Sequence, residues 1–500
     1  MAIRAKAQRI IVVAISLFVS LAVGCGGGGG STLPPASGPT TGFWATDFTT
    51  AQYYRINTTK VAEGVHCYIY LEQGQSVSQA TINAIVHEFD TKIYPTDTAT
   101  FGSEPNPGID NDPKIYILLL DIRDGFDPIT NPSFVAGYFD PLNEYPVSQN
   151  PNSNQKEMLY MDIYPTVAGS LTFFTIMAHE FQHMIHWEQK TALLGVVDDT
   201  WLDEGMAEIA PVYCGYGPSY DRVFTFESTP SDSLTIWNDT VEDYGVVYMW
   251  AQYFKDRFSG SNPDIFWNML HNSQTGINSV NAALASFSLT FTSTFRDWAI
   301  ANYSGNAINW GGHPEWSYTS IDMRPGNHGG VVLPGLSMSQ NASQTSALDS
   351  WSVGYYDYTT SAPTGSVTWT LAGGSSDKAS FVDSGAPQIY PDLASGATYT
   401  FKGTGYLIVS NPTGAASPGN DTVSHLAVTQ DYSSTVQSVK SGSNQQTSVK
   451  TPRMMLDEAS MNPSLQQLVQ QTGEPQHICV HSFFSEREKA LRAKGARPPF

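Results

Sequence analysis

The sequence predicts an α+β fold, in which a mixed α and β domain is followed by a small all-β domain. Two continuous apolar runs, at residues 114–121 and 158–164, have the length and composition of buried strands. Longer segments carry apolar residues at helical spacing, most densely at residues 170–188. After about residue 340 charged residues become rare, and short β-rich runs alternate with turn residues.

Residues 1–25 have the pattern of a lipoprotein-type signal peptide and are not expected to belong to the folded domains. A basic start precedes an apolar stretch at 10–23, which is too short for a comfortable membrane span. The stretch ends in Leu-Ala-Val-Gly-Cys, which resembles a lipobox and predicts lipid attachment at Cys25. Residues 26–42, rich in glycine, serine and proline, follow as a flexible tether. We expect an extracytoplasmic protein held on a bacterial membrane by this lipid, with ordinary secretion as the alternative.

The remaining chain divides by composition into three parts. Residues 43–335 form the predicted mixed domain, 340–432 an accessory β-sandwich without a recognisable catalytic set, and 433–500 a linker with a disordered or weakly helical tail. In the mixed domain we expect strands at 67–71, 114–121 and 158–164, and helices at 77–89, 170–188, 243–258, 265–272 and 291–303. In the accessory domain we expect strands at 351–358, 366–371, 398–401, 406–410 and 425–428.

Charge and cysteine content narrow the classes of partner. The chain has 46 acidic and 25 basic residues, for a formal net charge of −21. This excludes nucleic acid and charge-driven binding to anionic membranes, because both rely on clustered lysine and arginine. A lipid at Cys25 leaves Cys67, Cys214 and Cys479, which permit one disulfide at most.

The pentad His179-Glu180-Phe181-Gln182-His183 lies inside the most apolar helical segment. Residues four apart on a helix share a face, so His179 and His183 can bind one metal ion. Glu180 can then take a proton from a water molecule on that metal. The plain alternative is a pair of core histidines that hydrogen-bond to backbone. His186 is a rival ligand, although it lies a further turn along the helix.

A second helical run supplies a third ligand. Twenty residues separate His183 from Glu204, enough for a turn and an adjacent antiparallel helix. Two histidines and one glutamate are an established ligand set for catalytic zinc. Glu208, one turn further on, is placed to accept a proton from a ligand imidazole and fix its orientation. Its plain alternative is an ordinary solvated helix residue.

These segments resemble a known enzyme family. HEFQHMIHW followed by TWLDEGMAE resembles the gluzincin metallopeptidases, and within them the hyicolysin-like family of secreted bacterial peptidases. The similarity covers roughly residues 45 to 305. It implies zinc at His179, His183 and Glu204 with Glu180 as general base, and it departs from the family at Asp203, where relatives usually have Asn. It also implies that the strand before the zinc helix forms a sheet edge on which an extended peptide can lie.

Two further roles concern the oxyanion of the reaction and a calcium ion. Gluzincins usually take the donor that stabilises the oxyanion from a Tyr or His after the third ligand, and Tyr244 is our choice ahead of Tyr248 and His328. Calcium is a further candidate cofactor, although solvated acids are the plainer reading because no EF-hand spacing is present. The acids concerned flank the strand at 114–120 and are Asp110, Asp112, Asp121, Asp124 and Asp127.

The sequence therefore predicts a zinc metallopeptidase that acts on extracytoplasmic proteins or peptides, with an endopeptidase preferred. One alternative is an aminopeptidase, but no segment resembling the GxMEN motif that grips a free amine is present. The other alternative is a surface binding or adhesion protein that kept the scaffold and lost the chemistry. The intact His179, Glu180, His183 and Glu204 favour the enzyme.

Overall fold

The computed structural model describes residues 40–499, with gaps at 307–309, 311, 341–344, 360–364, 372–377, 385–387, 395, 397, 413–425, 435–475 and 478–479. The predicted signal peptide, Cys25 and nearly all of the expected tether lie outside the described residues. The described residues belong to one compact unit.

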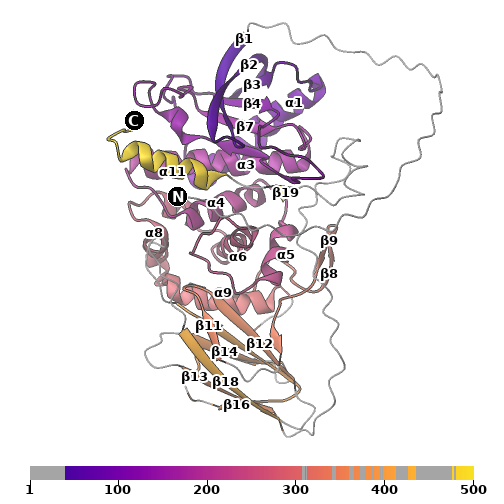
Figure 1. Ribbon diagram of the computed structural model, residues 1–500. Helices are drawn as coiled ribbons and strands as arrows, with labels where there is room; N and C mark the ends of the chain where they lie inside the picture. Colours follow the sequence, from indigo (N-terminus) through magenta and orange to yellow (C-terminus); the bar gives the residue numbers. More distant parts are fainter. Residues whose placement is uncertain are drawn as a thin grey trace, which may run out of the picture. The chain divides into compact units, whose positions relative to one another are not determined.

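A six-stranded mixed sheet forms the first half of the structure (Figure 1). Its strands, in spatial order, are β1 (Thr40–Asp47), β2 (Gln52–Glu63), β3 (Cys67–Glu72), β4 (Ile115–Leu120), β7 (Met158–Asp162) and β6 (Gly137–Phe139). β3, β4 and β7 are parallel, whereas β6 is antiparallel to β7 and ends the sheet. Every residue of β4 is buried, because the strand reads IYILLL and both of its faces are covered.

The edge of this sheet differs from the expectation. β7, the strand directly before the helix that carries His179 and His183, lies between β4 and β6. The prediction that this strand forms an edge of the sheet is therefore wrong. β6 is the edge strand instead, since the chain reverses after β6 and returns as β7 to pair with β4. A short strand, β5 (Ser133–Phe134), precedes β6.

Helices pack on one face of the sheet and beyond it. α3 (Leu171–His186) contacts β6, β7 and α4 (Thr200–Tyr213), and α4 contacts α6 (Val241–Arg257). The other α-helices of this part are α1 (Gln79–Glu88), α2 (Tyr94–Phe101), α5 (Tyr220–Ser228), α7 (Ile265–Leu270), α8 (Gly276–Leu284) and α9 (Phe291–Ser304). Short 3-10 or π turns are η1 (Phe89–Ile93), η2 (Pro141–Glu144), η3 (Trp187–Leu193), η4 (Ala285–Phe287) and η5 (Pro314–Trp316). The predicted helices and strands of this part are confirmed, with ends shifted by a few residues.

Two β-sheets follow the helical part. One has the strand order β10 (Ser339–Gln340), β12 (Val353–Thr359), β17 (Thr404–Ser410), β14 (Lys378–Asp383) and β15 (Gln388–Tyr390). The other has the order β11 (Thr345–Leu348), β18 (Leu426–Ser434), β13 (Gly365–Leu371) and β16 (Thr398–Phe401). A small hairpin, β8 (Gly326–His328) and β9 (Val331–Leu333), lies before them. The two sheets share an apolar cluster that includes Tyr358, Trp369 and Phe381. The presence of both helices and strands confirms the α+β class. A separate sandwich domain stays a prediction.

The described residues near the end of the chain include a helix, in a region for which the sequence predicted a disordered or weakly helical tail. α11 (His481–Arg492) is a helix with buried residues on one side, and Figure 1 draws it in yellow near α3. A two-residue strand before it, β19 (Gln476–His477), pairs in parallel with β5. His481, Phe484 and Glu488 form the buried side of this helix.

The described residues contain no helix that is both long and apolar enough to cross a membrane. Cys67 and Cys214 are buried free thiols. Cys479 lies outside the described residues, and the two described cysteines form no disulfide.

Candidate metal centre

Helix α3 carries both predicted histidine ligands. The hydroxyl of Ser170 caps its first turn by accepting a hydrogen bond from the backbone N–H of Phe173 at 3.1 Å. Apolar side chains surround the helix, which therefore lies buried against the sheet and α4. His179 and His183 lie one turn apart on one face, and their Nε2 atoms are 3.1 Å apart. A single metal ion can contact both imidazoles.

Glu204 reaches the same point from helix α4. Its Oε2 atom lies 3.6 Å from Nε2 of His179 and 3.6 Å from Nε2 of His183. A tetrahedral zinc ion with bonds of about 2.0–2.1 Å requires ligand atoms about 3.3 Å apart. The three observed separations bracket this value, so the donor set fits zinc.

Glu180 lies beside the ligands and is held by the edge strand. Its Oε2 atom accepts a hydrogen bond from the backbone N–H of Phe139 in β6 at 3.0 Å, and its Oε1 atom is buried with no hydrogen-bond partner among the described residues. Burial raises the pKa of this carboxyl to about 7. The strand comes this close because residue 137 is glycine: a Cβ there would lie 2.9 Å from Ile176 Cγ2.

Each ligand imidazole turns its other nitrogen toward a carboxylate of α4. Nδ1 of His183 is 2.8 Å from Oδ1 of Asp203, and Nδ1 of His179 is 3.7 Å from Oε1 of Glu208. Arg222 of α5 holds Glu208 with two hydrogen bonds, at 2.9 and 2.7 Å. Such outer contacts fix the tautomer and orientation of a metal-binding histidine. The structure thus places Glu208 near the position expected for it.

Asp203 gathers three imidazoles around one carboxylate. Besides His183, it faces Nδ1 of His186 at 3.2 Å and Nε2 of His481 at 2.8 Å. Burial alone would raise the pKa of Asp203, but the three imidazoles outweigh burial and hold it well below its ordinary value. His186 points away from the ligand atoms, so it does not act as a third ligand in this arrangement.

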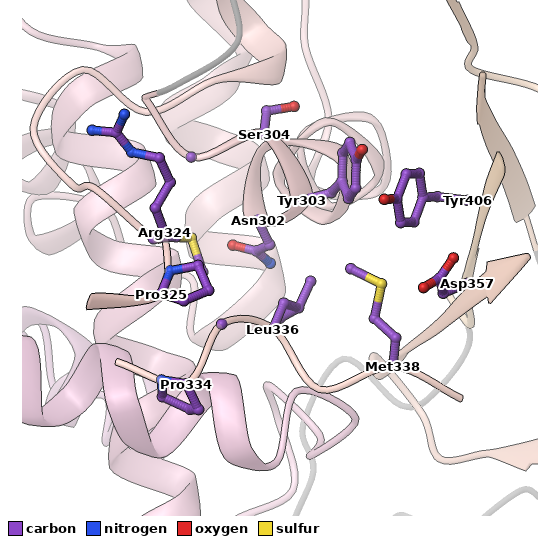
Figure 2. A pocket seen from close by; sticks show the side chains of 13 residues that line it. Asn302, Tyr303, Ser304, Arg324, Pro325, Pro334, Leu336, Met338, Asp357 and Tyr406 are labelled. Atoms are coloured by element: carbon purple, nitrogen blue, oxygen red, sulfur yellow. The ribbon is translucent and has the colours of Figure 1, made fainter. Parts of the chain in front are cut away.

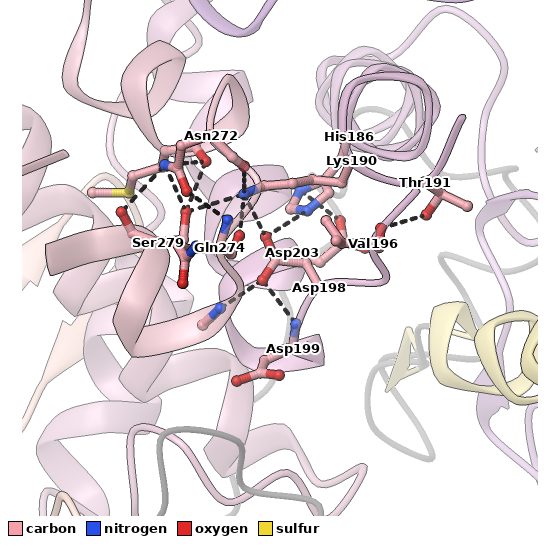
Figure 3. A network of polar contacts seen from close by, with 12 residues as sticks. His186, Lys190, Thr191, Val196, Asp198, Asp199, Asp203, Asn272, Gln274 and Ser279 are labelled. Atoms are coloured by element: carbon pink, nitrogen blue, oxygen red, sulfur yellow. Dashed lines mark hydrogen bonds and ion pairs between the residues drawn. The ribbon is translucent and has the colours of Figure 1, made fainter. Parts of the chain in front are cut away.

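A buried polar network continues from Asp203 into the helical part (Figure 3). Nε2 of His186 lies 3.3 Å from Asp198, which is 3.5 Å from the ammonium group of Lys190. Lys190 is fully buried and donates hydrogen bonds to the carbonyl oxygens of Asn272 and Gln274 at 2.9 and 2.7 Å. These contacts anchor the far side of the site to the loop between α7 and α8.

The three candidates for an oxyanion donor have different surroundings. The guanidinium of Arg222, which binds Glu208, lies over the ring of Tyr244 at 4.9 Å. The hydroxyl of Tyr248 is used in structural hydrogen bonds with Ser219 and Gln252. His328, the last residue of β8, stacks on Tyr220, and its Nε2 atom is 2.9 Å from the carbonyl oxygen of Arg324.

The acids proposed for calcium serve other purposes. Asp112, Asp124 and Asp127 accept hydrogen bonds from backbone N–H groups of their own turns, and Asp110 pairs with Lys156. Among the described residues these acids form no group of three able to hold one cation. Calcium therefore has no support from this cluster.

A pocket of about 500 Å³ lies away from the metal ligands (Figure 2). It is lined by residues of α9, of the segment after Met323, and of β12 and β17, with the rings of Tyr303 and Tyr406 4.4 Å apart. None of the described lining residues belongs to the candidate metal centre. Pocket and metal centre are therefore separate features.

Sequence reasoning gave no contact with the site to three residues, one inside the second motif and two outside both motifs. Asp203 was noted only as a departure from the family pattern, although its position beside Glu204 was a usable signal. Arg222 and His481 carried no signal, because their contacts with Glu208 and Asp203 join residues far apart in the chain.

The fold and the site together have the arrangement expected of gluzincin metallopeptidases: an HExxH helix beside a mixed sheet, with a glutamate from the next helix. The chain is similar to the neutral metalloprotease ShpI of Staphylococcus hyicus, with 34% identity over 201 residues. This match covers 37% of the chain and 44% of ShpI, so the chain matches less than half of that relative. No family model matches the sequence. The similarity to ShpI confirms the resemblance to a zinc metallopeptidase family.

Proposed function

We propose that this chain is a zinc metallopeptidase that hydrolyses peptide bonds of extracytoplasmic proteins or peptides. One observation carries the proposal: donor atoms of His179, His183 and Glu204 converge at zinc-binding separations, with the carboxyl of Glu180 beside them. The similarity to ShpI supports the same activity.

His179, His183 and Glu204 would hold the zinc. When bound, zinc supplies Lewis acidity, which polarises a peptide carbonyl and acidifies a water molecule. Asp203 and Glu208 keep the ligand imidazoles turned toward the metal through their Nδ1 atoms. The protein thus supplies a fixed and buried ligand set.

Glu180 performs the proton transfers in this proposal. Its Oε2 atom stays on the N–H of Phe139, while Oε1 is available to accept a proton from the attacking water. The same carboxyl group then gives that proton to the leaving amine, so Glu180 returns to its ionised form. Tyr244 is proposed to donate a hydrogen bond to the oxyanion that forms from the carbonyl oxygen.

The finer features of the proposal follow the sequence. An endopeptidase is preferred, because no aminopeptidase motif that grips a free amine is present. Action outside the cytoplasm, with a lipid anchor at Cys25, follows from the leader pattern. The residues after 340 are proposed as an accessory β-sandwich for packing or for substrate or surface binding.

The test compares zinc content and casein hydrolysis of the full chain with those of Glu180→Gln. We expect the variant to keep its zinc and lose roughly 10²- to 10⁴-fold in kcat, because only the proton acceptor is removed. Glu188→Gln is the matched control: it removes another buried carboxylate of the same helical segment and leaves activity unchanged. A wild type that binds zinc and hydrolyses peptides no faster than Glu180→Gln supports the binding-protein alternative.

A further inference from the structure

We infer that the C-terminal segment is an internal cover of the peptide-binding edge, which a protein substrate must displace. The cover consists of the described residues 476–477 and 480–499. The inference rests on the proposed peptidase function, and concerns the regulation of the same site. It is carried by contacts of the cover with β5, β6, α3 and α4.

The edge strand β6 faces the catalytic base. The backbone N–H of Phe139 points outward from the sheet and donates to Glu180. An extended peptide that adds to this edge would therefore pass directly beside Glu180. Edge strands offer unpaired backbone groups to any chain that can reach them.

The cover begins by pairing with the strand that precedes β6. β19 and β5 form a two-stranded parallel sheet of their own, with Gln476 opposite Ser133 and His477 opposite Phe134. Only two residues separate β5 from β6, so the cover begins next to the edge strand that holds Glu180. Its backbone pairing is the mode by which a peptide substrate would bind.

The next residues of the cover reach the metal ligands. The ring of His481 stacks on that of His183, with centroids 4.1 Å apart and planes 5° apart. Nε2 of His481 lies 2.8 Å from Oδ2 of Asp203, the carboxylate that also faces His183. His179 and Glu180 are left only 6% and 2% exposed. Access of a peptide carbonyl to the ligands is thus restricted where the cover lies.

Three anchors hold α11 in place. The ring of Phe484 stacks on Tyr138 of β6, with centroids 5.1 Å apart. The carboxylate of Glu488 accepts hydrogen bonds from the hydroxyl of Tyr145 at 2.6 Å and from the indole N–H of Trp187 at 2.7 Å. These contacts join the cover to β6, to the turn after it and to the end of the zinc helix.

The packing of α11 combines a buried aromatic ring, a buried carboxyl group and a hollow. Phe484 is fully buried in the apolar cluster on this face of the sheet, which also contains Tyr138. A hollow of about 540 Å³ remains between α11 and β1–β2, bordered by Tyr53 and Arg487. The side chain of Glu488 adds polar contacts, and this residue is 4% exposed. Loss of the Phe484 and Glu488 contacts should therefore weaken the hold of the cover on the sheet.

The experiment uses full-length variants and two readouts. Phe484→Ala combined with Glu488→Ala removes all three anchors, and Glu486→Ala is the matched control, since Glu486 is an exposed residue of the same helix. We measure kcat/KM on a peptide substrate and the Kd of a peptide hydroxamate, which binds the metal and the edge together. We expect at least a tenfold rise in kcat/KM and a tenfold tighter Kd in the double variant, with the control equal to wild type.

Unchanged or weaker hydroxamate binding by a folded, zinc-loaded double variant overturns the inference and makes α11 an integral part of the site. Tighter binding without hydrolysis by any form keeps the cover and rejects the peptidase. Hydrogen exchange of the wild type gives a test that does not depend on the variants. Addition of the hydroxamate should accelerate exchange of α11 amides if the cover is displaced, whereas slower exchange contradicts displacement.

Discussion

Asp203 contacts the imidazole of His183 through a 2.8 Å hydrogen bond, so the residue directly before one candidate metal ligand holds another. The same turn of α4 thus carries Glu204, whose carboxylate lies near both imidazoles, and Asp203, which contacts Nδ1 of His183. A change in the position of α4 would alter both contacts together. The relative positions of the candidate ligands therefore depend on the packing between α3 and α4.

Removal of this carboxylate should weaken metal binding. We expect Asp203→Ala to lower zinc affinity about 10- to 100-fold, because Nδ1 of His183 loses its acceptor. Asp203→Asn keeps a carbonyl oxygen at this place and should bind zinc within a few-fold of wild type. Competition with a chromophoric chelator measures both affinities. Equal affinity of Asp203→Ala and wild type would show that the contact has no role in orienting His183.

The Arg222–Glu208 pair should behave as a buried ion pair. Both side chains are about nine-tenths buried, so Arg222→Met leaves a carboxylate without its bidentate partner. We expect a loss of about 3–5 kcal/mol in the free energy of unfolding. Arg222→Met combined with Glu208→Gln should recover part of that loss, because the orphaned charge is gone. Urea unfolding of the wild type, the two single variants and the double variant gives the coupling energy between Arg222 and Glu208. Additive effects of the two substitutions contradict the prediction.

Tyr244 can be tested against a neighbouring tyrosine. If Tyr244 stabilises the oxyanion, Tyr244→Phe should lower kcat by roughly 10²-fold with little change in zinc content. Tyr248→Phe is the matched control, because its hydroxyl bonds to Ser219 and Gln252 and should affect stability more than kcat. Steady-state kinetics on one peptide decide between them. A wild-type kcat for Tyr244→Phe removes Tyr244 from the mechanism.

A pair of buried glutamates predicts how stability depends on pH. Burial raises the pKa of Glu157 from its ordinary value of 4.5 to about 7, and that of Glu144 well above its ordinary value. The folded chain therefore holds protons that the unfolded chain releases. This contribution to stability is complete below pH 4.5 and is lost as pH rises toward 7.

Glu157→Gln should flatten this dependence. The amide keeps an oxygen to accept the hydrogen bond from the N–H of Ile109, but it cannot ionise. We expect the fall in the free energy of unfolding between pH 5 and pH 8 to shrink by roughly 1–3 kcal/mol. Urea unfolding at several pH values measures it, with the exposed Glu486→Gln as control. A variant whose profile parallels that of the wild type argues against the raised pKa.

The parts of the site that could be predicted are those set by local spacing. His179 and His183 follow from the helical repeat, and Glu204 follows from a second helix with an acid at the expected separation. Strands such as β4 were predictable because a continuous apolar run has few other solutions.

The parts that could not be predicted depend on contacts between distant segments. The position of β6 at the edge depends on how the chain reverses after Phe139, which no periodicity records. The docking of α11 could not be predicted either, because the sequence alone does not show that Glu488 accepts hydrogen bonds from Tyr145 and Trp187. The contacts of His481 have the same origin.

Gly137 gives the site a property that no side chain could supply. A Cβ at this position would lie within 3.1 Å of the carbonyl oxygen of Tyr160 and 2.9 Å of Ile176. The distance between the edge strand and the helix that carries Glu180 is therefore set by the absence of a single methyl group. The hydrogen bond between Glu180 and the N–H of Phe139 therefore depends on the smallest residue in the sheet, and in the proposed mechanism this residue sets how far the carboxyl lies from a peptide bound at the edge.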